Sequence, residues 1–144
     1  MPVRTYDPKK VLVLVGRIPI SGFADGTFIS VSRSNDLFTK TSGADGVVTR
    51  VKSNDLSGEI TMTLAQTSPS NDYMSSIALA DELANKGVVP VTISDTSGRS
   101  NYVSAFAWIR KHPDSEFSKE VSNREWVLDC ADLDLLTGGN PDAE

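Results

Sequence analysis

The alternation of apolar and polar residues in GVVTRVKSNDLSGEITMTLAQ, residues 46–66, constrains the fold more than any other stretch of the chain. Successive side chains of a β-strand point to opposite faces, so a period of two indicates a strand with one face buried. Two such runs, residues 47–52 and 59–65, flank the turn-forming residues 54–58. The stretch predicts a long β-hairpin whose second strand turns three residues toward a core: Ile60, Met62 and Leu64.

Other segments have the composition of further strands. β-Branched and aromatic residues are frequent in five further segments: residues 10–15, 24–33, 88–95, 101–112 and 120–130. With the two strands of the predicted hairpin, this makes about seven strands.

One segment, SNDYMSSIALADELANK (residues 70–86), has the pattern of an amphipathic helix. Ser68 suits the N-cap, Pro69 the first helical position, and Gly87 the left-handed position after the end. A helical wheel places five residues on one face: Tyr73, Ile77, Ala80, Leu83 and Ala84. Together the elements predict a mainly β fold, a β-sandwich or small barrel carrying one helix.

Two segments hold apolar residues for which the chain offers no evident core. Residues 35–46, NDLFTKTSGADG, have the polar and turn-forming content of a loop but also contain Leu37 and Phe38. The C-terminal tail, residues 131–144, contains Leu133 and Leu135 beside a Gly-Gly-Asn-Pro sequence. Exposed apolar patches mark interaction sites, so the composition of both segments raises the question of what covers them.

Charge limits the class of partner. The net charge of −5 argues against a protein that grips nucleic acid, because such binding depends on clustered Lys and Arg residues. The first ten residues are basic and residues 129–144 are acidic, which fits either two solvated tails or head-to-tail attraction between copies. No apolar run approaches the roughly 20 residues of a membrane span, and the start lacks a signal peptide. Synthesis in the cytoplasm and no membrane span are therefore expected.

Chemistry-bearing motifs are absent from the sequence. The chain has one cysteine, one histidine, no metal-binding spacing and no phosphate-binding loop, so no cofactor or metal is expected. Cys130 follows a strand-like run and is expected to be a small buried residue, and His112 a solvated turn residue. These observations predict that the protein is not an enzyme.

Two other functions remain open at this level. A monomeric ligand-binding β-sandwich could bind carbohydrate through Tyr102, Trp108 or Trp126, although aromatic residues in alternating strands favour packing. A small hydrolase could use Asp or Glu side chains, which are more simply explained as helix and tail charges.

Several motifs resemble those of the tail tube proteins of contractile-tailed bacteriophages. They are ISGFADGTFI (20–29), GADG (43–46) followed by the TR, SND, SG and QTS elements of residues 49–72, and REW (124–126). The resemblance covers most of the chain but not the terminal LTGGNPDAE. It implies a fold similar to the type VI secretion tube protein: two packed antiparallel sheets, a sandwich or partial barrel, flanked by one α-helix.

The same resemblance implies an assembly. Hexameric rings would stack into a tube within a contractile sheath, with baseplate and tail-terminator proteins at the ends. DNA would pass through the channel without specific binding. The protein would be made in the cytoplasm of the bacterial host and reside in the virion tail.

Within this assembly, the 144 residues are expected to form a single tail-tube domain. An N-terminal arm (1–9), an extended assembly loop (34–46) and the C-terminal tail (131–144) would reach other subunits. The expected interface residues are Tyr6, Leu37, Phe38, Leu133 and Leu135. Glu59, Thr61 and Thr63 are expected on the channel wall, and Asp81 and Glu82 on a helix face turned to the sheath.

Overall fold

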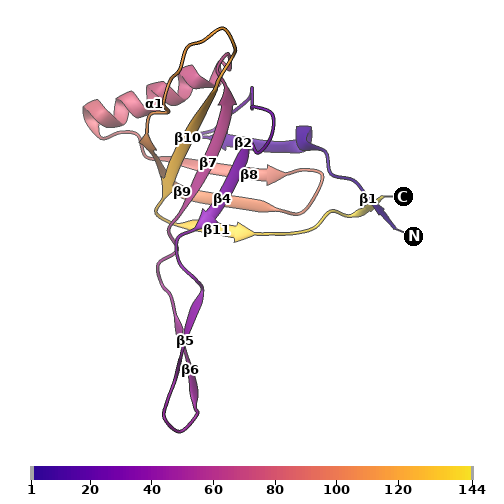
Figure 1. Cartoon of the computed structure of the whole chain (residues 1–144), viewed down its shortest axis with the longest axis vertical. Helices are drawn as coiled ribbons and strands as arrows, with labels where there is room; N and C mark the ends of the chain where they lie inside the picture. The colour runs from indigo at the N-terminus through magenta and orange to yellow at the C-terminus, as the bar shows by residue number, and fades with distance from the viewer. Residues whose placement is uncertain (1, 144) are drawn as a thin grey trace.

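A computed structural model describes residues 2–143 and shows a mainly β protein with a single α-helix in this range (Figure 1). A short 3-10 helix spans Pro8–Lys10. The strands and helix are β1 (Val3–Arg4), β2 (Val11–Val15), β3 (Ile18–Pro19), β4 (Ile29–Arg33), β5 (Phe38–Ser42), β6 (Val48–Lys52), β7 (Gly58–Ala65), α1 (Ser70–Ala84), β8 (Val89–Asp95), β9 (Asn101–Lys111), β10 (Asn123–Cys130), β11 (Leu133–Leu136) and β12 (Asp142–Ala143).

Eight of the strands form one antiparallel sheet that bends into two packed layers. Its order is β3-β2-β8-β9-β10-β7-β4, and β11 pairs with the first half of β9. Strands β7, β10 and β4 cross strands β2, β8 and β9 at a steep angle (Figure 1). The arrangement is a partial barrel, and it confirms the fold class predicted from the sequence.

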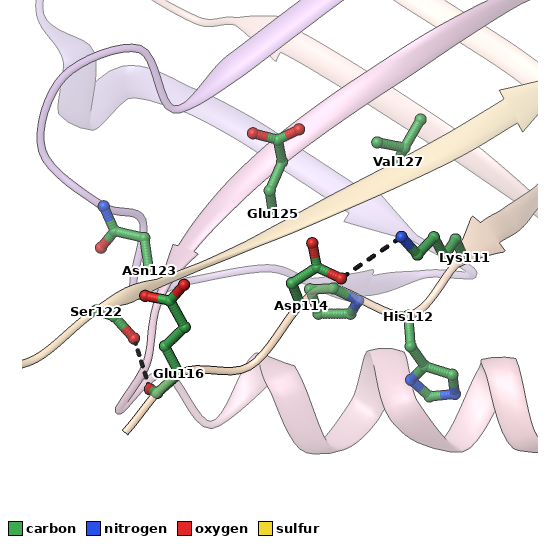
Figure 2. A pocket seen from close by; sticks show the side chains of 9 residues that line it. Lys111, His112, Asp114, Glu116, Ser122, Asn123, Glu125 and Val127 are labelled. Atoms are coloured by element: carbon green, nitrogen blue, oxygen red, sulfur yellow. Dashed lines mark hydrogen bonds and ion pairs between the residues drawn. The ribbon is translucent and has the colours of Figure 1, made fainter. Parts of the chain in front are cut away.

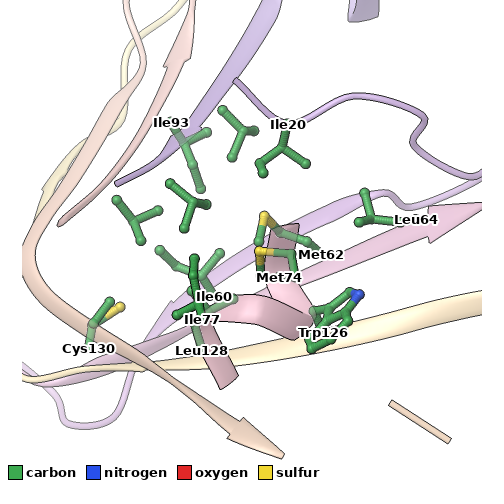
Figure 3. Packing of buried hydrophobic residues seen from close by; sticks show 14 of the residues in the cluster. Ile20, Ile60, Met62, Leu64, Met74, Ile77, Ile93, Trp126, Leu128 and Cys130 are labelled. Atoms are coloured by element: carbon green, nitrogen blue, oxygen red, sulfur yellow. The ribbon is translucent and has the colours of Figure 1, made fainter. Parts of the chain in front are cut away.

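The core lies between the two layers. Ile93 from one layer lies in one cluster with Ile60, Met62 and Leu128 from the other (Figure 3), and Val13 and Val91 belong to the same cluster. Residues along β7 are alternately buried and half-buried, which confirms the period-two interpretation of residues 59–65. Each Å² of apolar surface that is removed from water stabilises the folded state by about 25 cal/mol. The buried face of β7 is therefore a main source of stability.

The prediction of a hairpin over residues 46–66 is wrong, because its two strands do not pair with each other. Strand β6 pairs with β5, and β7 pairs with β4 and β10. The chain reverses at the Gly43–Gly46 turn, where Gly43 N–H donates to the Val47 carbonyl at 2.9 Å. Residues 29–65 therefore form one long hairpin, and the expected loop 34–46 contains strand β5.

The predicted turn at residues 54–58 is a kink in the returning strand. Asp55 accepts a hydrogen bond from the Ser57 N–H at 3.0 Å and one from the Asn35 side chain at 2.7 Å. This is the local chemistry of an Asp-containing turn, and the sequence signal was therefore real. The chain does not reverse there, because Ser34 N–H donates to the Ser57 carbonyl at 3.0 Å and continues the β4–β7 ladder.

Helix α1 forms where the sequence predicted it, but with a different buried face. Met74 and Ile77 lie in the core, whereas Leu83 is 75% exposed. Asn85, rather than Gly87, takes the left-handed conformation after the last turn. The predicted buried face is wrong for the second half of the helix, because this half extends beyond the sheet that the helix covers (Figure 1).

The two ends of the chain pair with each other. Strands β1 and β12 form a two-stranded ribbon, and Arg4 forms an ion pair with Asp142 at 3.0 Å. The opposite charges of the ends therefore meet within one chain. Leu133 is fully buried in the core, so the prediction that it lies in a tail without a core, available to another subunit, is wrong.

Candidate assembly surfaces

The most prominent surface is the arm formed by residues 34–57, which projects from one end of the molecule (Figure 1). Every residue of β5 and β6 is exposed, and the two strands pair only with each other. Leu37 is 61% exposed, Phe38 41% and Val51 52%. An isolated two-stranded hairpin is marginally stable in water. The arm therefore presents apolar side chains that its own chain does not cover.

The turn that builds the arm was missed in the sequence. GADG lies between two runs with strand composition, and a short Gly-containing loop between such runs is a hairpin signal. Gly46 has φ +84°, the left-handed conformation that glycine adopts without strain.

A second surface is the outer face of the β4–β7–β10 layer. Glu59, Thr61 and Thr63 alternate with the buried residues of β7 and point away from the core, as predicted. Across the ladders Ser30 and Val127 lie beside Thr61. Hydroxyl and acidic side chains are frequent on this surface, which also carries Val127, Trp108 and Arg110.

Arg110 changes the charge of this surface. Its guanidinium donates to the Asp129 carboxylate at 3.0 Å and also forms an ion pair with Glu59. The hydrogen bonds to Asp129 and Glu59 raise the pKa of Arg110, because they stabilise its charged form. Glu59 is therefore not a free carboxylate, and two acidic groups share one cation here. The possible pairing of Glu59 with Arg50 or Lys52 does not occur in this chain, because β6 does not lie beside β7.

Helix α1 and the outer Glu59 face lie on opposite sides of the β7–β10 layer, since Met74 and Ile77 pack into the core on the inner side. Glu82 is exposed on the helix. Asp81 is half-buried, and its carboxylate accepts the Gly87 N–H at 3.3 Å. Of the two acidic residues predicted on the outward face, Glu82 is thus the more exposed and the more available to a partner.

The remaining predicted interface residues lie apart from the arm. Tyr6 is 59% exposed beside a pocket of about 450 Å³ that also involves Ile29 of β4 and Ile93 of β8. Leu135 is 39% exposed on β11. The structure therefore distributes the predicted residues over three places, with Leu133 in none of them.

The aromatic residues do not form a sugar-binding platform. Trp126 is buried and donates its indole N–H to Asn71 at 3.0 Å. Tyr102 packs on the core, while Trp108 lies opposite Asp129 on the outer face. A register shift in β9 lies between these two positions, so Tyr102 and Trp108 are on opposite faces although they are an even number of residues apart.

Reactive groups are likewise unsuited to catalysis. Cys130 is buried, as predicted, and desolvation raises the pKa of its thiol, which keeps it protonated. His112 is exposed at the end of β9, with its ring 5.8 Å from that of Trp126. No cluster of metal-ligating side chains occurs within residues 2–143, and no helix of this range has the length and apolar character to cross a membrane.

Comparison with known proteins gives consistent matches. The family model described as the bacteriophage PhiTE tail tube protein matches residues 19–138. Structural protein ORF10 of Pseudomonas phage KPP10 is 33% identical and is aligned over 94% of this chain and 83% of its own length.

Solved structures with a similar fold come from contractile injection systems. The tube-terminating cap of the anti-feeding prophage superposes with a TM-score of 0.67 at 13% identity, covering 95% of this chain and 94% of that chain. A chain of the sheath–tube complex of the extracellular contractile injection system PVC gives 0.58 at 16% identity, covering 92% and 91%. The sheath/tube terminator of the same system gives 0.61 at 16% identity, covering 94% and 99%.

Proposed function

Because the chain belongs to the family of the bacteriophage PhiTE tail tube protein, we propose that it is the repeating subunit of a phage tail tube. It is a structural protein related to the tubes of phage tails and contractile injection systems, and not an enzyme. In the proposed assembly, hexameric rings stack into a hollow tube inside a contractile sheath and conduct DNA during ejection. Baseplate and terminator proteins would bind the tube ends, and the subunit would be made in the cytoplasm of the bacterial host.

The observation that carries the proposal is the arm. It places apolar side chains far from the core, and a free monomer gains nothing from their exposure. Packing of Leu37 and Phe38 on another subunit would bury that surface. The free edges of β4 and β3, each paired on one side only, give a second reason for association, because joined edges remove unpaired backbone groups.

The arrangement of the two layers supports the orientation of the subunit. The Glu59 face, with its small hydroxyl and acidic side chains, suits the channel wall, since a wall that bound phosphate would retain DNA. The helix on the other side of the layer would then face the sheath, with Glu82 exposed to it. A sheath co-assembly assay with Glu82→Lys tests this orientation: unchanged binding would place the sheath contact elsewhere.

The primary test is electron microscopy of the purified protein, wild type and Leu37→Ser/Phe38→Ser. Wild-type protein is expected to form rings or tubes. The double variant should remain folded, because both residues are exposed, but should no longer form stacked tubes. Wild-type protein that stays monomeric at high concentration would contradict the tube function. Normal tubes from the double variant would show that the arm is only a surface feature.

The channel wall has a separate test. Glu59→Lys with Thr61→Lys adds cations next to Arg110 on a face that is not part of the core. Tubes should still assemble, whereas DNA ejection should slow at low salt and recover as salt rises, because the Debye length shortens to about 8 Å at physiological ionic strength. Unchanged ejection kinetics at low salt would exclude this face from the channel.

A further inference from the structure

The two faces of the arm differ in charge. Residues paired across an antiparallel ladder lie on the same face. Phe38 pairs with Lys52 and Lys40 with Arg50, so three cations lie on one face. The guanidinium of Arg50 lies 4.2 Å from the centre of the Phe38 ring, in agreement with this assignment. The other face carries no charge, since its pairs are Thr39 with Val51 and Thr41 with Thr49.

The cationic face is unfavourable in an isolated chain. Lys40 lies directly opposite Arg50, and like charges in this position destabilise a hairpin. No ion pair among the described residues involves Lys40, Arg50 or Lys52. Asp45 at the tip instead accepts the Val47 N–H at 3.2 Å, and Asp36, near the base, pairs with none of the three. Carboxylates from outside the arm would therefore reduce this repulsion.

A surface that holds several carboxylates, together with Lys111 and Lys119, lies at the opposite end of the long axis. The loop between β9 and β10 is found there, beside helix α1 (Figure 1). Asp114, Glu116 and Glu125 surround a shallow pocket of about 380 Å³ (Figure 2). Asp114 pairs with Lys111 at 3.5 Å, whereas Glu116 and Glu125 form no ion pair within residues 2–143.

The same end also exposes apolar side chains. Phe117 is 83% exposed and Val121 67%. The arm and the β9–β10 loop are thus complementary in two respects. The arm carries cations and the loop carries carboxylates, and both surfaces expose apolar side chains.

We propose that the cationic face of the arm docks on the acidic β9–β10 end of a second copy, so that subunits stack head to tail along the long axis. A contact between two different surfaces of the same chain repeats without closing, which is what a growing tube requires. The inference rests on the proposed tube function and adds to it the surface, the partner residues and the polarity of stacking. Because the contact is charged, stacking weakens as salt shortens the Debye length.

Charge exchange tests the contact. One variant reverses the arm (Lys40→Glu, Arg50→Glu and Lys52→Glu), and a second reverses the pocket (Glu116→Lys and Glu125→Lys). Each variant alone should lose pelletable tubes, because its two ends carry the same charge. A chain with all five substitutions should recover them, and so should an equimolar mixture of the two variants, in which each arm meets a complementary pocket.

Two controls separate this result from misfolding and from failure of the tube function. Lys40→Arg with Lys52→Arg keeps the charge and should assemble like the wild type, and thermal melts should show that all variants are folded. Absence of wild-type tubes would contradict the proposed function itself. If the wild type assembles, then normal tubes from either reversed variant, or no recovery in the five-substitution chain, would overturn the docking contact alone.

Discussion

The base and the tip of the long hairpin, residues 29–65, differ sharply although they belong to the same two strands. At the base, β4 and β7 place Ile60, Met62 and Leu64 in the core, each fully buried. At the tip, β5 and β6 have a comparable antiparallel ladder, but all their residues are exposed and neither face is uniformly apolar. Backbone pairing is therefore the same in both halves, and only tertiary packing distinguishes them.

This difference shows that backbone pairing makes a strand but does not by itself bury the side chains that the strand carries. A strand acquires a core only if another element lies against it, and within residues 2–143 both strands of the arm are exposed along their whole length. The base should accordingly determine the stability of the subunit, whereas the tip should determine what the subunit binds.

Truncation of matched leucines gives the largest expected contrast. Leu64→Ala removes a fully buried side chain at the base and should lower the free energy of unfolding by about 2–5 kcal/mol. Leu37→Ala, at a site 61% exposed on the arm, should change it by less than about 0.5 kcal/mol. Urea denaturation of the monomer measures both. Similar losses in the two variants would mean that the arm is folded against the body in solution.

A matched pair of glycines gives a smaller contrast. At Gly58, at the base, an added Cβ would lie 2.5 Å from the Ser32 carbonyl oxygen and 2.6 Å from a methyl of buried Leu133. Gly58→Ala should therefore cost about 1–3 kcal/mol of global stability, because a well-packed core cannot absorb the extra group.

At Gly46, at the tip, an added Cβ would meet nothing within 4 Å, so only the left-handed backbone opposes substitution. Gly46→Ala should cost roughly 1–2 kcal/mol locally. Local opening of the arm limits its effect on global unfolding. Hydrogen exchange should accelerate in residues 38–52 and remain unchanged in β7. Faster exchange in β7 as well would show that base and tip open as one unit.

Much of the candidate site was accessible from the sequence. Leu37 and Phe38 were identified as uncovered because two large apolar residues occur in a polar segment. Glu59, Thr61 and Thr63 were placed opposite the core because period two admits only one assignment once Ile60, Met62 and Leu64 face inward. The ion pairs of Arg110 with Glu59 and Asp129 were not foreseeable, because they join three strands whose order in the sheet is not written in local patterns.

The sequence by itself determined most of the longer strands, the helix and the alternating face of β7, because these depend on residues close together along the chain. Tertiary structure alone decided which of two turn signals, residues 43–46 or residues 54–58, reverses the chain. Both segments have turn chemistry, but only reversal at residues 43–46 lets β4 pair with β7 and keep its buried face on the core. The burial of Leu133 was decided in the same way, since β11 reaches the core only by pairing with β9, nearly thirty residues earlier in the chain.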